Sequence, residues 1–160
     1  MPLEDIILTG TKTAAQNING AEGTEANLTW DVVAQDATEI TSFSNGDSVI
    51  QITKACWINL HASCVITNGA ANNRTMIMLS LVHTDSADTE KYTYRGDVQY
   101  NRDDADAYDA SGGCIDKSMI CCDAGDKLYL QTRILDDGTA IGTMAPDTTY
   151  SKIRIARITF

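Results

Sequence analysis

Apolar and polar residues alternate with a period of two over most of the chain, from Asn27 onward. The clearest run covers residues 55–67, in which every second residue from Cys56 to Ile66 is apolar. Because successive side chains of a strand point to opposite faces, this run predicts a strand with one face against a core. No segment shows a convincing helical period. The pattern therefore predicts an all-β protein.

Turn residues divide this alternating part into eight expected strands. They cover residues 28–33, 48–53, 55–67, 75–84, 91–100, 114–122, 127–135 and 151–160. Short, regularly spaced strands are typical of antiparallel two-sheet sandwiches and jelly rolls. The length of 160 residues fits one domain, which we expect at 27–160. Residues 1–26, rich in Thr, Ala, Asn and Gly, are expected to form an extended N-terminal arm or a first edge strand.

The charge balance excludes several kinds of partner. The chain has 22 acidic and 12 basic residues, which gives a net charge of −10. Nucleic-acid binding needs clustered Lys and Arg, and anionic membranes also attract basic surfaces, so neither partner is expected. No apolar run approaches the roughly 20 residues of a membrane span. The first residues include Glu4 and Asp5, which argues against a secretory signal.

The five cysteines show no metal-binding or redox spacing. Cys56 and Cys64 lie on one expected strand, roughly 26 Å apart at about 3.3 Å per residue, so they cannot pair. The adjacent Cys121 and Cys122 point to opposite faces. The chain has no CxxC pair. We therefore expect small, buried, reduced cysteines in a reducing compartment.

Two expected strands are apolar or aromatic on both faces. The second face of residues 55–67 carries Trp57 and His61. In the closing strand, Ile153 and Ile155 share one face, and the opposite face carries Ala156, Ile158 and Phe160. Either a bulge or a sheet end explains this pattern, or the second face is buried against other subunits. Apolar patches on soluble proteins tend to mark interfaces, which favours the second explanation.

No catalytic constellation is evident. The two histidines, His61 and His83, fall in the middle of separate strands and are expected to be structural. The sequence contains no GxSxG, HExxH, P-loop or GxGxxG motif. We therefore do not expect an enzyme or a bound cofactor.

Acidic loops are the remaining candidate sites. Calcium prefers carboxylate and carbonyl oxygens, so these loops are weak candidates for a calcium site. The candidate ligands are Asp103, Asp104, Asp106, Asp136 and Asp137. Their spacing does not match an EF-hand, and solvated turn aspartates are the favoured explanation. Tyr100 and Tyr108, at the start and inside of the 101–113 loop, are candidate contacts for a ligand.

An ordered set of segments resembles the C1q/TNF-like jelly rolls, above all the small viral versions in phage heads and tails. The resemblance spans residues 11–160. It rests on Thr13-Ala14-Ala15-Gln16-Asn17-Ile18, Leu28-Thr29-Trp30-Asp31, Ile50-Gln51-Ile52, Cys56-Trp57-Ile58, Ala124-Gly125-Asp126-Lys127-Leu128-Tyr129-Leu130, and Tyr150-Ser151-Lys152-Ile153 continuing to Ile158. The turn before Trp57 lacks the glycine that is usual there.

The resemblance implies a jelly roll of about eight to ten strands that forms a homotrimer, with the closing strand beside residues 55–67 near the threefold axis. Trp57, His61, Ile158 and Phe160 are then expected at the trimer interface. Ile6, Ile7 and Leu8 in the arm are expected to dock on a capsid.

The expected function is that of a virion structural protein, a trimeric decoration protein that binds the major capsid protein. It would be assembled in the host cytoplasm and reside on the capsid surface. The alternative is a fibre-head module that binds a receptor or a host-surface glycan.

Overall fold

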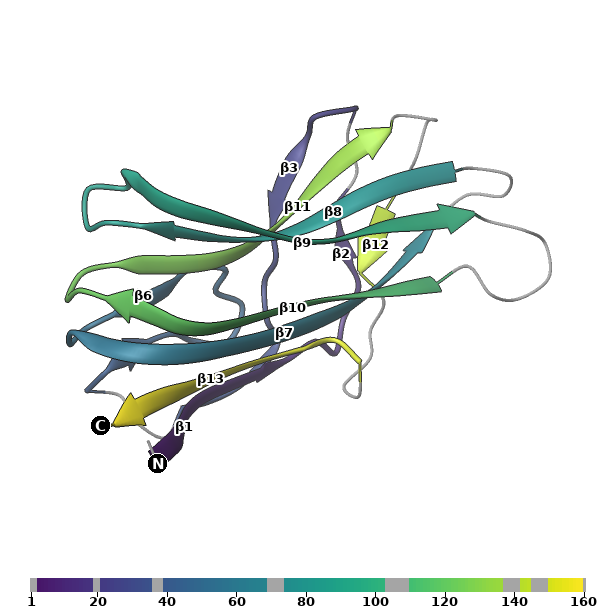
Figure 1. The fold of residues 1–160 in the computed structure, drawn as a ribbon. Helices are drawn as coiled ribbons and strands as arrows, with labels where there is room; N and C mark the ends of the chain where they lie inside the picture. Colours follow the sequence, from purple (N-terminus) through teal and green to yellow (C-terminus); the bar gives the residue numbers. More distant parts are fainter. Residues whose placement is uncertain are drawn as a thin grey trace.

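The computed structural model describes residues 3–18, 21–35, 39–68, 74–102, 110–136, 142–144 and 150–159. These residues form two antiparallel sheets that lie face to face (Figure 1). No helix occurs in these ranges, and so none that could cross a membrane. The predicted all-β, two-sheet jelly-roll architecture is confirmed.

The first sheet has seven strands, in the order β2-β12-β7-β13-β1-β4, with β10 on the other edge of β7. Its strands are β1 (Leu3–Thr11), β2 (Gln16–Asn17), β4 (Val32–Gln35), β7 (Cys56–Asn68), β10 (Ala110–Cys122), β12 (Gly142–Met144) and β13 (Lys152–Thr159). The closing strand β13 lies between β7 and β1, so it is an inner strand of this sheet.

The second sheet has six strands, in the order β5-β6-β11-β8-β9, with β3 paired to β11. Its strands are β3 (Glu25–Asn27), β5 (Thr41–Ser42), β6 (Ile50–Ile52), β8 (Arg74–Thr84), β9 (Glu90–Arg102) and β11 (Lys127–Asp136). The thirteen described strands exceed the eight to ten expected, because six of them are only two to four residues long. The long strands match the periodic runs closely.

The core fills the space between the sheets. Ile58 and Leu60 of β7 are fully buried there, as are Leu79 and Leu81 of β8. Burying one such side chain contributes about 1.5–3 kcal/mol. Gly96 of β9 brings the edges of the two sheets together, since a Cβ at this position would lie 3.0 Å from the carbonyl oxygens of both Cys114 and Leu79.

The strand expected at residues 28–33 is only partly correct, because of these residues only Val32 and Val33 lie in a strand, at the start of β4. Residues 28–30 are outside any strand, although Leu28 and Trp30 are almost fully buried. The amide of Leu28 donates to the carbonyl of Leu130 at 2.8 Å, and the amide of Trp30 donates to that of Asp47 at 3.2 Å. Here the chain crosses from β3 in one sheet to β4 in the other. The alternation therefore reflects burial in the core and not strand pairing.

The expected extended arm or first edge strand does not describe β1. β1 pairs with β13 on one side and with β4 on the other, so it is an inner strand. Ile6 is opposite Ala156 and Leu8 is opposite Ile155, which leaves Ile7 as the extra residue of a β-bulge. The bulge lets Ile7 and Leu8 both enter the core, so neither can dock on another protein; only Ile6 is exposed.

The cysteines only partly match expectation. All five are free thiols. Cys64 and Cys122 are buried and Cys56 is half-buried, but Cys114 and Cys121 are exposed. The exposed pair shares the face of β10 turned away from the core, because the bulge between Lys117 and Ile120 shifts the alternation between Cys114 and Cys121 by one residue.

Candidate interaction surface and buried polar network

The outer face of the seven-stranded sheet, which we define as the side turned away from the six-stranded sheet, carries an apolar end. Trp57 of β7 lies opposite Ile158 of β13, and Ile6 of β1 lies opposite Ala156. Ala156 and Ile158 are shielded within the subunit, but Ile6 is 41% and Trp57 40% exposed. The face expected from the sequence to be apolar is thus open in the single subunit.

A strained bulge marks the β10 edge of this face. The β7–β10 register shifts between Lys117 and Ile120, and Met119 takes a φ of 60°. A residue with a Cβ is disfavoured in this left-handed region. The side chain of Asn59 compensates, because its Oδ1 accepts the amide of Met119 at 2.9 Å. As a result Met119, which is 50% exposed, is held at the edge.

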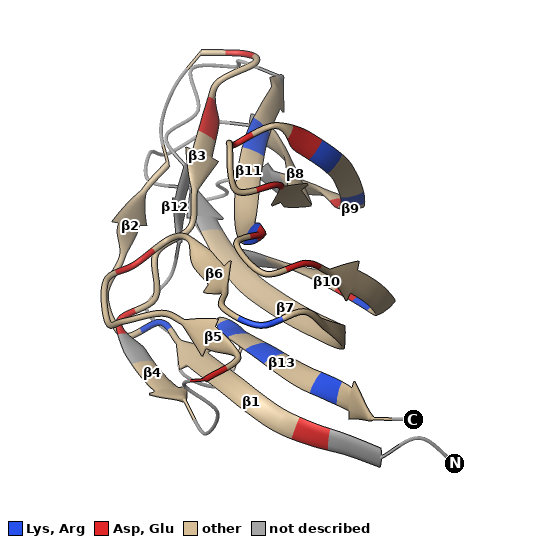
Figure 2. Cartoon of the chain, turned by 90° about the vertical axis from the view of Figure 1, so that its left-hand side faces the viewer, with Lys and Arg blue, Asp and Glu red and all other residues tan. Residues whose placement is uncertain are grey.

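The centre of the outer face is polar. Arg154 of β13, His61 of β7 and Asp116 of β10 form one row across three strands. His61 Nδ1 lies 3.9 Å from Asp116 Oδ2, and both side chains are exposed. This row borders a hollow of about 310 Å³, lined by Asn59, Leu60, His61, Asp116, Ser118, Arg154 and Ala156. Figure 2 shows the basic residues of β13 along this sheet.

A second hollow lies farther along the same face. Its volume is about 340 Å³, and Val65, Gly112 and the exposed Tyr150 contribute to its mostly apolar lining. A Cβ on Gly112 would meet no atom closer than 3.9 Å, so this glycine leaves the hollow open. The outer face therefore offers two open depressions and an apolar end.

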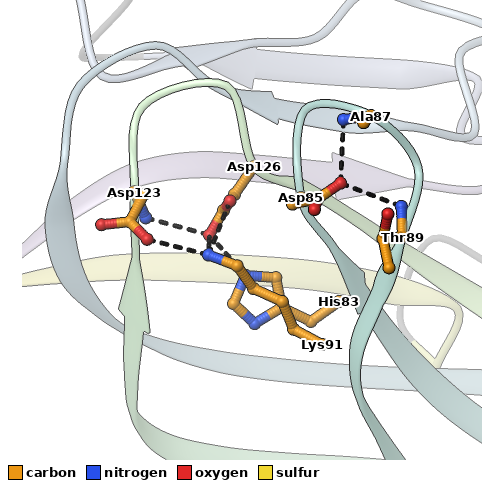
Figure 3. A network of polar contacts seen from close by, with 7 residues as sticks. All are labelled: His83, Asp85, Ala87, Thr89, Lys91, Asp123 and Asp126. Carbon is orange, nitrogen blue, oxygen red and sulfur yellow. Dashed lines mark hydrogen bonds and ion pairs between the residues drawn. The ribbon is translucent and has the colours of Figure 1, made fainter.

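A buried polar network lies at the end of the sandwich where β10 turns into β11 (Figure 3). His83 Nε2 lies 2.7 Å from Asp126 Oδ2, and the two side chains are only 1% and 2% exposed. Lys91 Nζ donates to both oxygens of Asp126, at 2.9 and 2.8 Å, and to Asp123 Oδ2 at 2.8 Å. The amide of Asp123 also donates to Asp126 Oδ2, at 2.9 Å.

These contacts set the protonation of the network. Burial alone would raise the pKa of Asp126, but hydrogen bonds from Lys91, from the Asp123 amide and from His83 together hold that pKa below its usual range. The same hydrogen bonds, to Asp123 and Asp126, raise the pKa of Lys91. Asp126 therefore remains an anion at neutral pH, with an ammonium as its partner. The network ties the turn between β10 and β11 to the end of β8 and the start of β9.

The network also contains side-chain atoms of the kind that coordinate a metal ion. Single ligand atoms of His83, Cys122 and Asp126 lie within 4.8 Å of one another. However, Lys91 already donates to both carboxylate oxygens of Asp126, so a metal ion would have to displace it. The arrangement fits a structural role, and the structural role expected for His83 stays a prediction.

The residues singled out from the sequence are placed as follows. Trp57, His61 and Ile158 lie on one face, while Phe160 is outside the described residues. The calcium candidates Asp103, Asp104, Asp106 and Asp137, together with Tyr108, also lie outside them. Asp136 ends β11, with its side chain undescribed. Tyr100 is exposed on β9 of the six-stranded sheet, where it lies opposite Met76 of β8.

Several residues of the surface were not found from the sequence. The position of Met119 and its hydrogen bond to Asn59 depend on a bulge, and Arg154 and Asp116 join His61 only through the strand register. No feature of the local sequence predicts that Met119 adopts a left-handed backbone conformation. The partners of Asp126 were likewise hidden, because Lys91 and His83 flank a different turn.

Comparison with known proteins adds evidence on the fold. Neither a scan against protein-family models nor a search of curated proteins finds a match. Among solved structures, murine APRIL at pH 8.5 matches with a TM-score of 0.63 and 6% identity, over 95% of this chain and 98% of that chain. Eiger TNF from S. frugiperda matches with a TM-score of 0.59 and 10% identity, over 96% and 93%.

A complement protein has the same architecture. The globular domain of zebrafish complement 1qA matches with a TM-score of 0.51 and 8% identity, over 98% of this chain and 97% of that chain. Identities this low are evidence for the fold alone. Together with the two antiparallel sheets, these matches show that the chain has the C1q/TNF-like jelly-roll fold.

Proposed function

We propose that this chain is a non-catalytic structural protein that assembles as a homotrimer through the outer face of the seven-stranded sheet. The observation that carries the proposal is the apolar surface left open there. Ile6 and Trp57 are 41% and 40% exposed on the face, and Met119 is 50% exposed at its β10 edge. Large apolar side chains clustered on a soluble protein mark interaction surfaces.

The distribution of charge supports a ring of identical subunits. Lys152 and Arg154 lie on the β13 side of the outer face, whereas Asp116 lies on the β10 side. In a cyclic oligomer, one patch of each subunit meets a different patch of the next. An acidic edge and a basic strand on opposite sides of one face suit such a contact. The jelly-roll fold is compatible with this arrangement.

We further propose that the trimer attaches to a virion, as a decoration protein on the major capsid protein. The resemblance of its ordered motifs to the phage versions of this fold supports this role, as does the absence of a recognised catalytic motif in the sequence. In this proposal the protein is assembled in the host cytoplasm and remains on the capsid surface. Sedimentation with empty capsids at fixed stoichiometry tests it; a protein that stays in the supernatant at micromolar concentration contradicts it.

The oligomeric state is tested by light scattering coupled to gel filtration. The wild-type protein is expected at about three times the chain mass of 17.3 kDa. The double variant Ile6→Asp/Trp57→Asp should elute as a folded monomer, because it places two charges in the apolar end. Val98→Asp is the matched control, since Val98 is 49% exposed on the six-stranded sheet. A wild-type monomer, or a double variant that stays trimeric, sinks the proposal.

The second candidate is a glycan- or receptor-binding head. A specific observation favours it: the outer side of the six-stranded sheet has a polar hollow of about 260 Å³. Its lining includes Tyr129, Gln131, Arg95 and Arg133, a combination of ring and hydrogen-bonding groups that suits sugars. This side remains free when the other sheet is used for association. Glycan-array binding that Tyr129→Ala abolishes would support the candidate, and an array without signal would contradict it.

A further inference from the structure

Two cysteines face each other across the first sheet. Cys56 is the first residue of β7, Cys122 is the last residue of β10, and the antiparallel register makes them direct partners. Directly opposed residues in such a ladder have Cα atoms about 4.5 or 5.5 Å apart and side chains on the same face. Disulfides span about 4.4–6.8 Å between Cα atoms. The backbone therefore already has the spacing of a cross-strand disulfide.

None of the other cysteines meets this condition. Cys121 lies opposite Trp57 and is exposed on the outer face, pointing away from Cys122. Cys64 is opposite Gly113 and Cys114 is opposite Ser63. Cys64 and Cys114 therefore belong to adjacent rungs and point to opposite sides of the sheet.

The surroundings of the pair determine how it reacts. Cys122 is fully buried and Cys56 is half-buried, so a reagent reaches Cys56 first. Burial raises the pKa of Cys122, with a further contribution from the nearby Cys56, and burial also raises the pKa of Cys56. Only the thiolate exchanges with disulfides, so both thiols react slowly at neutral pH and faster in alkali. At the ends of their strands, the two residues can approach without disturbing the rest of the ladder.

We propose that Cys56 and Cys122 form a redox-sensitive pair that closes to a cross-strand disulfide once the protein leaves a reducing compartment. The Cys56 thiolate attacks one sulfur of a low-molecular-weight disulfide RSSR and releases one RS⁻. The Cys122 thiolate then attacks the Cys56 sulfur of the mixed disulfide and releases the second RS⁻. Two electrons pass to RSSR, and the two thiol protons end on the two RSH formed.

The disulfide would close a loop of about 65 residues and so restrict the unfolded chain more than the native one. It would also fasten the ends of the two strands whose other faces carry Trp57 and Cys121. The proposal does not depend on self-association. A chain made in a reducing cytoplasm and later released would carry the dithiol first and the disulfide afterwards.

The test uses the full chain, diluted to prevent links between molecules and incubated with oxidised glutathione at pH 8.5. Non-reduced peptide mapping is expected to find a Cys56–Cys122 peptide two hydrogens lighter than the sum of its parts. The melting temperature should rise by about 10 °C, and a reductant should reverse both changes.

Variants make the assignment specific. Cys56→Ser should abolish the linked peptide and the thermal shift, whereas Cys121→Ser, the neighbour on the other face, should keep both. Cys122→Ala is a second variant that leaves no partner for Cys56 and should retain glutathione there. The proposal is overturned if Cys56 and Cys122 both remain alkylatable while Cys114 and Cys121 carry glutathione. A link between any other two cysteines overturns it as well.

Discussion

The chain contains two His–Asp pairs in opposite environments. On the outer face, His61 Nδ1 and Asp116 Oδ2 are 3.9 Å apart, with side chains 42% and 72% exposed. At the end of the sandwich, His83 Nε2 and Asp126 Oδ2 are 2.7 Å apart and only 1% and 2% exposed. Water screens the first pair, whereas the second interacts in a medium of low polarity. The same two residue types thus form a weak surface contact in one place and a structural lock in the other.

The two pairs differ in the number of further hydrogen-bond donors that contact the carboxylate. Asp126 accepts from Lys91 and from the Asp123 amide as well as from His83, so its oxygens are fully used inside the subunit. Among the described residues, Asp116 has only the long contact to His61, which leaves its carboxylate available to a partner. A His–Asp pair whose carboxylate makes all its hydrogen bonds inside the subunit stabilises the fold. A pair whose carboxylate still has free acceptor positions can bind another subunit.

The largest effect is expected when the buried pair is broken. Asp126→Ala should lower the free energy of unfolding by about 3–5 kcal/mol, because it leaves Lys91 and His83 without their shared acceptor. Asp126→Asn, which keeps the shape but not the charge, should lose less. Urea unfolding at pH 7 measures the free energy of unfolding of both variants. If Asp126→Ala unfolds within about 1 kcal/mol of the wild type, the buried pair is not more stabilising than the surface pair.

Acid should weaken the same lock. Asp126 has a lowered pKa in the folded state, so its stabilising contribution is present above its unfolded value of 3.8 and is lost as the pH falls through the folded value. The stability advantage of the wild type over Asp126→Asn should therefore be constant near neutral pH and shrink below about pH 4. Urea titrations of both proteins across this range measure it. A difference that grows on acidification contradicts the assignment.

The bulge beside the surface pair should respond more modestly. Asn59→Ala removes the acceptor of the Met119 amide and should cost about 1 kcal/mol. Met119→Gly should instead stabilise the subunit by about 1 kcal/mol, because glycine adopts a φ of 60° without strain. Thermal unfolding of a non-associating background separates these changes from assembly. Two variants that shift stability in the same direction would disprove the strain.

The smallest effect belongs to the surface pair itself. Asp116→Asn should change the free energy of unfolding of the isolated subunit by less than about 0.5 kcal/mol, as exposed ion pairs contribute little. If the outer face is the association surface, the same variant should weaken the oligomer measurably at low salt. Sedimentation equilibrium at two salt concentrations tests this. The control is Asp88→Asn, which removes a charge in the turn between β8 and β9 of the other sheet.

The long strands could be predicted from the sequence, because their alternation directly records which face is buried. Residues 55–67 became β7 with Ile58, Leu60 and Ile66 in the core, as predicted. The expected strand at 28–33 failed at residues 28–31, because a buried crossing between sheets alternates in the same way as a strand. The two-residue strands carry too few residues to show any period.

The site was less accessible than the fold. The sequence could identify Trp57 and Ile158 as members of a second face, since each lies in a long alternating strand. It could not pair Arg154 with His61, Lys91 with Asp126, or Cys56 with Cys122, because these contacts depend on strand register. Nor does a bulge in β1, which buries Ile7 and Leu8 together, leave a local signal.

The pairing of β1 with β13 has a consequence for the path of the chain. Leu3 lies opposite Thr159, so the start of β1 and the end of β13 lie side by side (Figure 1). A linker of a few residues would therefore join them into a closed ring, and new ends could be opened in the exposed turn at residues 86–88. Segments fused to either end would leave from the same corner of the sheet.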